Sequence, residues 1–208
     1  MTRALPRLLD RLDALGLHAT FFVEAINCES NAGAVGEILS RGHELGVHGW
    51  SHEPWAELTP ERERELLERS VAAFDSIGAR ATVFRPPGGG LTAATPALLR
   101  ELGYRRCSPA REAAPAVGTQ GIEWIPFDWE LVDAYHLMAR FGPLRARRGD
   151  SAAPLGARDA GERLAAALRR RHPGPQPQVV VLHPFLMLDD DWWDGTRQTL
   201  DLIAELSS

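Results

Sequence analysis

The sequence has little cysteine, no long apolar run and no surplus of positive charge. Its 208 residues contain two cysteines, Cys28 and Cys107, and their wide separation argues against a disulfide framework and favours two free thiols. No segment approaches the roughly 18 consecutive apolar residues of a membrane-spanning helix. The N-terminus lacks a basic start followed by an apolar stretch, so no secretion signal is predicted. If Met1 is the true start, these absences predict a soluble, cytoplasmic protein with no membrane partner.

The charge balance and the chain length restrict the class of protein. The formal net charge of -5 gives no electrostatic reason to expect a nucleic-acid partner, and we interpret the basic spots at Arg145, Arg147, Arg148 and 169–171 as solvated surface. With 44% hydrophobic and 25% charged residues, the composition is that of a globular protein. No composition break or long linker divides the chain, so a single domain over residues 1–208 is predicted.

Helical and strand patterns alternate along the chain. The strands are short apolar runs without polar alternation, which favours a parallel sheet covered by helices. Residues 134–157 show no sustained period, and we expect an irregular segment with some helix there. Helices are expected over residues 5–15, 31–41, 59–78, 92–102, 158–171 and 196–206, and strands over residues 19–23, 44–47, 81–84, 104–107, 123–127 and 178–182. This order predicts an α/β fold, a barrel of β/α units whose chemistry lies on the loops after the strands.

Two histidines follow the predicted strand 44–47. His48 and His52 are four residues apart in the run His-Gly-Trp-Ser-His, so one helical turn would point both imidazoles at the same spot. Neutral imidazole is a good ligand for zinc and other late first-row ions, but a carboxylate or water must complete the site. The alternative is a pair of surface or capping histidines, because so short a motif is weak by itself.

A glycine-rich turn follows the next predicted strand. Arg85-Pro86-Pro87-Gly88-Gly89-Gly90 would bring backbone N–H groups to the same face, where they could stabilise an oxyanion. The alternative is that the glycines merely end the strand and start the next helix. Arg85 would need an acidic partner if partly buried, and Asp128, Glu130 and Asp133 are the candidates.

A third histidine ends the strongest strand signal in the chain, residues 178–182. His183 lies where an imidazole could act as a general acid. A lone histidine at a strand end is more often structural, but three strand ends that each carry reactive residue types are harder to attribute to chance.

Together these motifs resemble the polysaccharide deacetylase family, also called the NodB-homology domain or carbohydrate esterase family 4. Residues 12–23 resemble its leucine-rich helix followed by Ala-Thr-Phe-Phe-Val, and Gly42-His43-Glu44-Leu45-Gly46 leading to His48 and His52 resembles its second motif. Arg85 to Gly89 resembles the third motif, with Gly88 in place of the usual aromatic residue. Leu182-His183 resembles the fifth. The run from His48 to Glu53 and His183-Pro184 are closest to the branch of peptidoglycan deacetylase-like and allantoinase-like proteins, whose substrates need not be sugars.

The sequence departs from the family in two motifs. The fourth motif is loose, because Trp129 to Asp133 keeps acidic and aromatic residues without the usual spacing. The family's first strand ends in Thr-Phe-Asp-Asp-Gly, and no equivalent precedes Leu12. The resemblance implies that one Asp of that motif acts as the base and that the other completes the metal site. We therefore expect a distorted (β/α) barrel that lacks its first strand, in a domain truncated at its N-terminus. Its metal site is expected to be incomplete. The sheet edges left by the missing strand could be covered by a homo-oligomer.

Three explanations for the missing motif compete. The start of the chain is misassigned or cut, or the domain has degenerated to a non-catalytic form, or Asp189, Asp190 and Asp191 replace the missing carboxylates. We favour the first. The third is disfavoured, because acidic runs are usually solvated loops.

The resemblance implies metal-dependent hydrolysis of a linear amide bond in an N-acetylated carbohydrate or another small amide. His48 and His52 would bind a divalent metal, for which zinc is expected, and the Gly88 N–H would stabilise the oxyanion. His183 would protonate the leaving amine, while Arg85 and Asp133 would orient the pocket. The rival hypothesis is a non-catalytic carbohydrate-binding module in which Trp50, Trp55 and Trp129 form stacking surfaces.

Overall fold

A computed structural model describes residues 3–115, 121–172, 174 and 177–207, and the chain divides into two compact units. We call His18–Pro126 the sheet unit, and Met1–Leu17 together with Phe127–Ser208 the helical unit. The single domain predicted over residues 1–208 stays a prediction.

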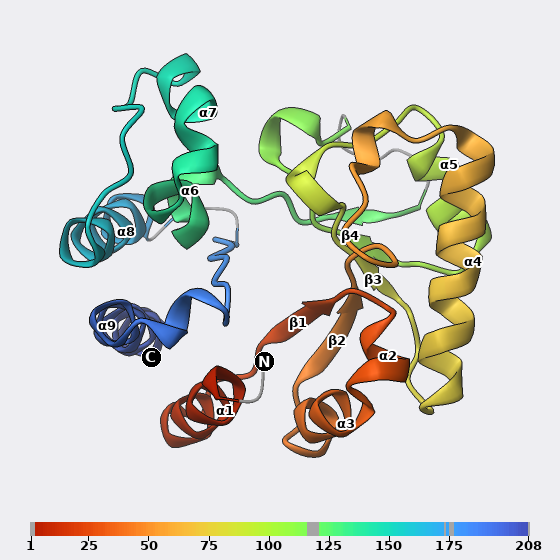
Figure 1. The fold of residues 1–208 in the computed structure, drawn as a ribbon, viewed down its shortest axis with the longest axis horizontal. Coiled ribbons are helices and arrows are strands. Elements are labelled where there is room, and N and C mark those ends of the chain that lie inside the picture. The colour runs from red at the N-terminus through yellow and green to blue at the C-terminus, as the bar shows by residue number, and fades with distance from the viewer. Residues whose placement is uncertain (1–2, 116–120, 173, 175–176, 208) are drawn as a thin grey trace. The chain divides into compact units, whose positions relative to one another are not determined.

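The sheet unit contains a five-stranded parallel sheet (Figure 1). Its strands follow one another in chain order, β1-β2-β3-β4-β5, and every neighbouring pair is parallel. The strands are β1 (Thr20–Val23), β2 (Glu44–Val47), β3 (Val83–Phe84), β4 (Arg106–Cys107) and β5 (Glu123–Trp124). The predicted α/β class and parallel sheet are confirmed, although β3, β4 and β5 are shorter than predicted. Because all five strands point the same way, the loops that follow them emerge at one edge of the sheet.

The helices of the sheet unit connect these strands. They are α2 (Asn27–Ser30), α3 (Ala32–Ser40), α4 (Pro60–Ser76) and α5 (Thr95–Glu101), with the 3-10 turns η1 (Trp55–Glu57), η2 (Pro87–Gly89) and η3 (Arg111–Ala113). The Thr59 side chain accepts a hydrogen bond from the Arg62 N–H, and Pro60 occupies the first turn of α4. This is the helix start that Thr59-Pro60-Glu61 predicts.

A buried carboxylate joins three segments of the sheet unit. Glu63 of α4 is fully buried. It accepts hydrogen bonds from the Trp55 indole at 2.8 Å, from the Thr92 hydroxyl at 2.6 Å and from the Thr95 hydroxyl. Because Thr92 follows the glycine-rich turn closely in sequence, its hydrogen bond to Glu63 connects that part of the chain to α4. A buried charge is tolerated only when its oxygens are satisfied in this way.

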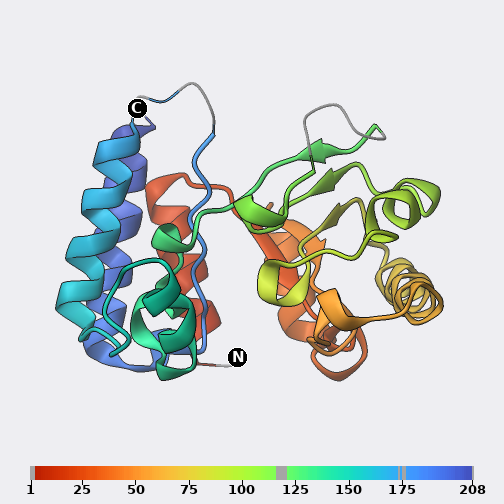
Figure 2. The same ribbon diagram turned by 90° about the horizontal axis from the view of Figure 1, so that it is seen from above.

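The helical unit is built from α1 (Ala4–Leu15), α6 (Asp133–Leu137), α7 (Gly142–Arg147), α8 (Ala157–Arg171) and α9 (Asp190–Leu206). It also contains the 3-10 turns η4 (Trp129–Leu131), η5 (Ala139–Phe141) and η6 (Leu186–Leu188). Figure 2 shows α8 and α9 side by side. Helix α1 ends as predicted at Gly16, whose φ of 64° is the left-handed conformation that terminates helices.

The strand predicted over residues 178–182 is wrong. Only Val181 makes a bridge, a parallel pairing with Val132. The Val181 N–H donates to the Leu131 carbonyl at 2.9 Å, and the Val181 carbonyl accepts from the Asp133 N–H at 3.1 Å. The residues around Val132 enter η4 and α6, so no extended partner continues the ladder. A β-branched sequence therefore remains extended without forming a strand.

The acidic run and one basic spot also have structural roles. Helix α9 begins six residues earlier than predicted, at Asp190, and the Asp189 side chain accepts from the Trp192 N–H at 3.0 Å as its N-cap. The negative charges thus stabilise the start of a helix, which weakens the hypothesis that they replace missing metal ligands. Arg145, expected on the solvated surface, is buried instead, and carbonyl oxygens of Tyr135, Met138, Ser151 and Ala152 accept its hydrogen bonds.

In the part of the chain that the structure describes, none of the helices has the length and apolar character needed to cross a membrane. The cytoplasmic location and the homo-oligomer expected from the sequence stay predictions.

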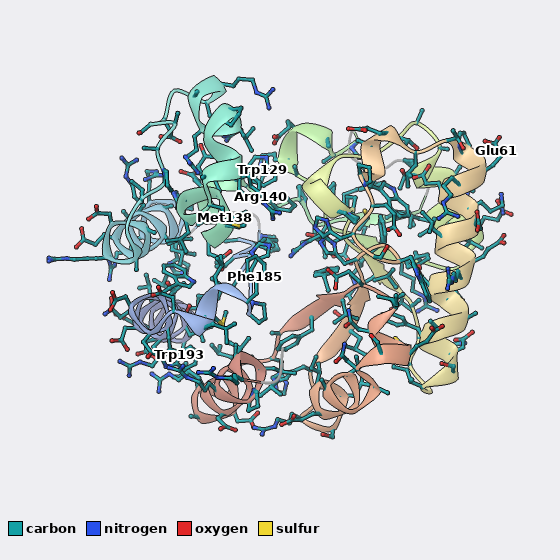
Figure 3. All side chains as sticks on the ribbon, viewed as in Figure 1. Glu61, Trp129, Met138, Arg140, Phe185 and Trp193 are labelled. Atoms are coloured by element: carbon teal, nitrogen blue, oxygen red, sulfur yellow. The ribbon has the colours of Figure 1, made fainter. Side chains whose placement is uncertain are left out.

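Replacing Glu63 with alanine should destabilise the sheet unit. The Trp55 indole N–H and two threonine hydroxyls would lose their charged acceptor and keep only contacts among themselves, so we expect the free energy of unfolding to fall by about 2–3 kcal/mol. Glu61, which is exposed on the same helix (Figure 3), supplies the matched control, and Glu61→Ala should cost less than about 0.5 kcal/mol. Urea denaturation measures both. If both variants lose the same free energy of unfolding, the hydrogen bonds of Glu63 do not make a large contribution to the stability of the sheet unit.

Candidate active site

The predicted histidine pair comes together at the end of β2. His48 follows the last residue of the strand, and its N–H donates to the Val23 carbonyl at 2.9 Å, so the backbone is fixed where the loop begins. The His48 and His52 rings lie 5.0 Å apart between centroids, at an angle of 80°. His52 is exposed and has a φ of 66°, a conformation that residues other than glycine rarely adopt. Backbone strain of this kind is often found at functional sites.

One hydrogen bond determines the tautomer of the neutral His48 ring. His48 Nδ1 lies 2.8 Å from the carbonyl oxygen of Arg85. A carbonyl oxygen only accepts, so in the neutral ring Nδ1 carries the hydrogen and Nε2 keeps its lone pair. Metal-binding histidines typically have this arrangement, in which a backbone carbonyl orients the ring through the nitrogen that does not bind the ion.

The donor set suits a late first-row divalent ion. Two imidazole rings in close contact, one of them in the tautomer with the lone pair on Nε2, fit a zinc-type ion as two of its ligands. Catalytic zinc sites usually have three protein ligands. Among the described residues, no group of three or more His, Cys, Asp or Glu side chains is placed to hold a metal ion.

Arg85 begins the glycine-rich turn at the end of β3. Its guanidinium donates to the Ser108 hydroxyl at 2.9 Å and lies 4.1 Å from the centre of the Phe22 ring. Removal of the guanidinium from water lowers the pKa of Arg85 to about 9, so the group is still cationic at neutral pH. Sequence reasoning missed Ser108, although its position after β4 could have indicated it. The acidic partner expected for Arg85 stays a prediction.

Gly88 has the backbone conformation that its turn requires. Its φ is 73°, the residue is exposed, and a Cβ there would meet nothing within 4 Å. Glycine is therefore favoured by the backbone angle and not by crowding. Gly88 lies inside the 3-10 element η2 and departs there from helical backbone angles. Whether these glycines only connect β3 to the next helix, as the alternative interpretation holds, stays open. The oxyanion role predicted for the Gly88 N–H stays a prediction.

In the helical unit, Asp133 binds His183. The Asp133 carboxylate is fully buried and lies 2.5 Å from His183 Nδ1 through Oδ1. Its Oδ2 accepts from the His183 backbone N–H at 2.7 Å. The pair of contacts fixes both the backbone and the ring of His183, with the proton of the neutral ring on Nδ1. A carboxylate in this position orients an imidazole and stabilises the ring when it becomes positively charged, as in acid–base catalysis.

The aromatic residues proposed as stacking surfaces are buried. Trp50, Trp55 and Trp129 are 5%, 0% and 7% exposed, so their rings belong to the core. Phe185 (Figure 3), two residues after His183, is instead 50% exposed. Its ring centre lies 5.5 Å from that of His183. The proximity of Phe185 to His183 in the sequence was the only signal that could have identified it.

The predicted site residues therefore form two groups. His48, His52, Arg85 and Gly88 lie on the loops after β2 and β3 in the sheet unit, and His183 and Asp133 lie in the helical unit. The first group can bind an ion and present a cation and backbone amides. The second can donate or accept a proton at His183 Nε2.

The similarities to known proteins agree with these motifs. A peptidoglycan-N-acetylglucosamine deacetylase of Listeria monocytogenes is 36% identical over 85 residues, which are 40% of this chain and only 18% of that protein. A crystal structure from Mycobacterium smegmatis, assigned to the polysaccharide deacetylases, is 26% identical and has a TM-score of 0.82 over 97% of this chain and 70% of its own. A pseudoenzyme of carbohydrate esterase family 4 from Bacillus anthracis is 19% identical, with a TM-score of 0.63 over 98% of this chain and 56% of its own. The last similarity shows the fold alone.

A family profile decides the assignment. The profile of the polysaccharide deacetylases matches residues 1–107, just over half of the 208 residues. The structural similarity over nearly the whole chain shows the (β/α) barrel class of fold that was predicted. The chain belongs to the polysaccharide deacetylase family.

Proposed function

We propose that this chain is the metal-dependent hydrolytic domain of a deacetylase that removes the acetyl group from an N-acetylated carbohydrate. The observation that carries the proposal is the hydrogen bond of His48 Nδ1 to the Arg85 carbonyl, with the His52 ring beside it. This bond presents a ligand nitrogen at a strand end, where a barrel of this class has its chemistry. Zinc is the proposed ion, because two imidazoles suit it well. When bound, the ion would polarise the amide carbonyl and make water a better nucleophile.

His183 is the proposed general acid. Hydrolysis breaks the C–N bond of the acetamide, and the departing amine needs a proton. With Asp133 holding Nδ1, His183 can deliver that proton from Nε2. The side chain of His183 is 28% exposed, whereas the Asp133 carboxylate that holds it is fully buried.

Arg85 and Gly88 are proposed to bind the reacting acetyl group. The Gly88 N–H would stabilise the negative charge that develops on the carbonyl oxygen. Arg85 is fixed by its contact with Ser108 and would supply a positive field beside the reacting group. The third metal ligand and the general base are not assigned, since no group of three His, Cys, Asp or Glu side chains is placed to hold a metal ion among the described residues.

A non-catalytic carbohydrate-binding domain is the second candidate. It is favoured by the lack of a third metal ligand among the described residues, and a pseudoenzyme shares the fold. The two candidates differ in one respect, because a binding domain would retain sugar in the absence of metal and release no amine.

Acetate release from N-acetylglucosamine oligomers tests the proposed function. We expect the chain loaded with zinc to release acetate and the chain treated with a chelator to release none. His48→Ala combined with His52→Ala should abolish both zinc binding and release, whereas His172→Ala, an exposed histidine in the other unit, should retain both. Sugar binding without acetate release in the zinc-loaded chain would favour the second candidate.

His183 and Asp133 should affect turnover without affecting zinc affinity. His183→Ala should lower kcat at least about 100-fold, because the leaving amine loses its proton donor. Asp133→Asn should also lower kcat, because the amide no longer stabilises the positive ring. Zinc titration and steady-state kinetics measure the two effects, with the exposed Asp159→Asn as control. A kcat retained in His183→Ala would remove His183 from the mechanism.

A further inference from the structure

We propose that Glu53 is a positioning residue that shapes the turn carrying His48 and His52, so that its carboxylate sets metal affinity without binding the metal. The inference rests on the proposed metal role of the histidine pair and extends it to a residue outside that pair.

Both oxygens of Glu53 bind the backbone of the turn. Oε2 accepts from the Trp50 N–H at 3.0 Å, and Oε1 accepts from the Ser51 N–H at 2.9 Å. Oε1 also accepts from the Ser51 hydroxyl at 3.0 Å. One carboxylate therefore collects three donors from two consecutive residues that lie between the histidines. Hydrogen bonds to a charged acceptor are stronger than neutral ones, so this turn has a strong local constraint.

The hydrogen bonds of Glu53 lie next to a residue with an unfavourable backbone conformation. His52 has a φ of 66°, and such a conformation persists only when the surroundings enforce it. Glu53 directly follows His52, and its side chain reaches back to the two residues that directly precede His52. Its carboxylate thus closes a small ring of chain around the strained residue, which holds the imidazole of His52 near that of His48.

The carboxylate also fills the space beside Gly49. A Cβ on Gly49 would lie 2.7 Å from Glu53 Oε2 and 3.0 Å from Pro87 Cγ. Glycine is favoured here by its φ of 70°, and a larger residue would also press on Pro87. Since Pro87 belongs to the turn that carries Gly88, Glu53 is packed into the place where the histidine turn and the glycine-rich turn approach each other.

Other contacts hold the turn from outside but do not replace Glu53. The Gly49 and Trp50 carbonyls accept from the N–H groups of Ala25 and Ile26, at 3.0 and 3.1 Å. The Arg69 guanidinium covers the buried Trp50 ring at 3.6 Å. These contacts attach the turn to the rest of the sheet unit, whereas the contacts of Glu53 determine its internal shape.

The substitution Glu53→Gln tests the proposal. Glutamine has one acceptor oxygen, so its NH2 group would face a backbone N–H and the turn would open. In the metal-free chain, the nuclear Overhauser effect between the His48 and His52 rings should be lost. Zinc affinity should fall at least about tenfold, the lower end of the loss that follows removal of groups that orient metal ligands. Glu57→Gln, an exposed residue of η1, is the matched control and should change neither quantity.

A graded variant separates positioning from loss of folding. Ser51→Ala removes one of the three hydrogen bonds at an exposed residue, so a smaller fall in zinc affinity is expected with an unchanged unfolding midpoint. If Glu53→Gln keeps the nuclear Overhauser effect between the two rings and the zinc affinity of the wild type, the proposal is overturned. A wild-type chain that shows the nuclear Overhauser effect between the His48 and His52 rings but binds no zinc would contradict the proposed function. The role of Glu53 in positioning the rings would then still be decided by comparing this effect in the wild type and in Glu53→Gln.

Discussion

Parallel strands β2 and β3 end side by side, and the 2.8 Å hydrogen bond between His48 Nδ1 and the Arg85 carbonyl joins their ends. The candidate metal site depends on this bond. It selects the tautomer of His48 and ties the histidine turn to the residue that starts the glycine-rich turn. The backbone pairing of β2 with β3 supports the same arrangement, because the Arg85 N–H donates to the Val47 carbonyl at 2.9 Å. A short parallel pairing is thus enough to bring two motifs, 37 residues apart in sequence, into one place.

Two histidines acquire different chemistry from different partners. His48 donates to a neutral carbonyl, which puts the lone pair of the neutral ring on Nε2, the nitrogen that we propose as a ligand. His183 contacts the buried Asp133 carboxylate, which orients its ring for the proton transfer that we propose. The same side chain is therefore suited to bind an ion in one unit and to move a proton in the other. The roles that we propose, metal binding for His48 and proton transfer for His183, follow from these partners.

Much of this could be predicted from the sequence, where local patterns decide the structure. The strand Glu44–Val47, the start of α4 at Pro60 and the end of α1 at Gly16 follow from apolar runs, capping and glycine, and all are confirmed. The strand predicted over residues 178–182 was wrong, because a strand needs a neighbouring strand to pair with, and β propensity alone does not supply one. The burial of Arg145 and of the three tryptophans depends on tertiary packing. The pairing of Asp133 with His183 joins residues 50 positions apart, which no local pattern indicates.

The central claim is that the loops after β2 and β3 form a metal site of which His48 and His52 are two ligands. Anomalous X-ray scattering at the zinc edge, from crystals of the chain soaked in zinc, tests it most directly. The account predicts one strong peak within about 2.0–2.1 Å of His48 Nε2 and of a nitrogen of His52, the usual zinc–imidazole distance. A peak bound elsewhere, or none at this histidine pair while zinc occupies other sites, would contradict it.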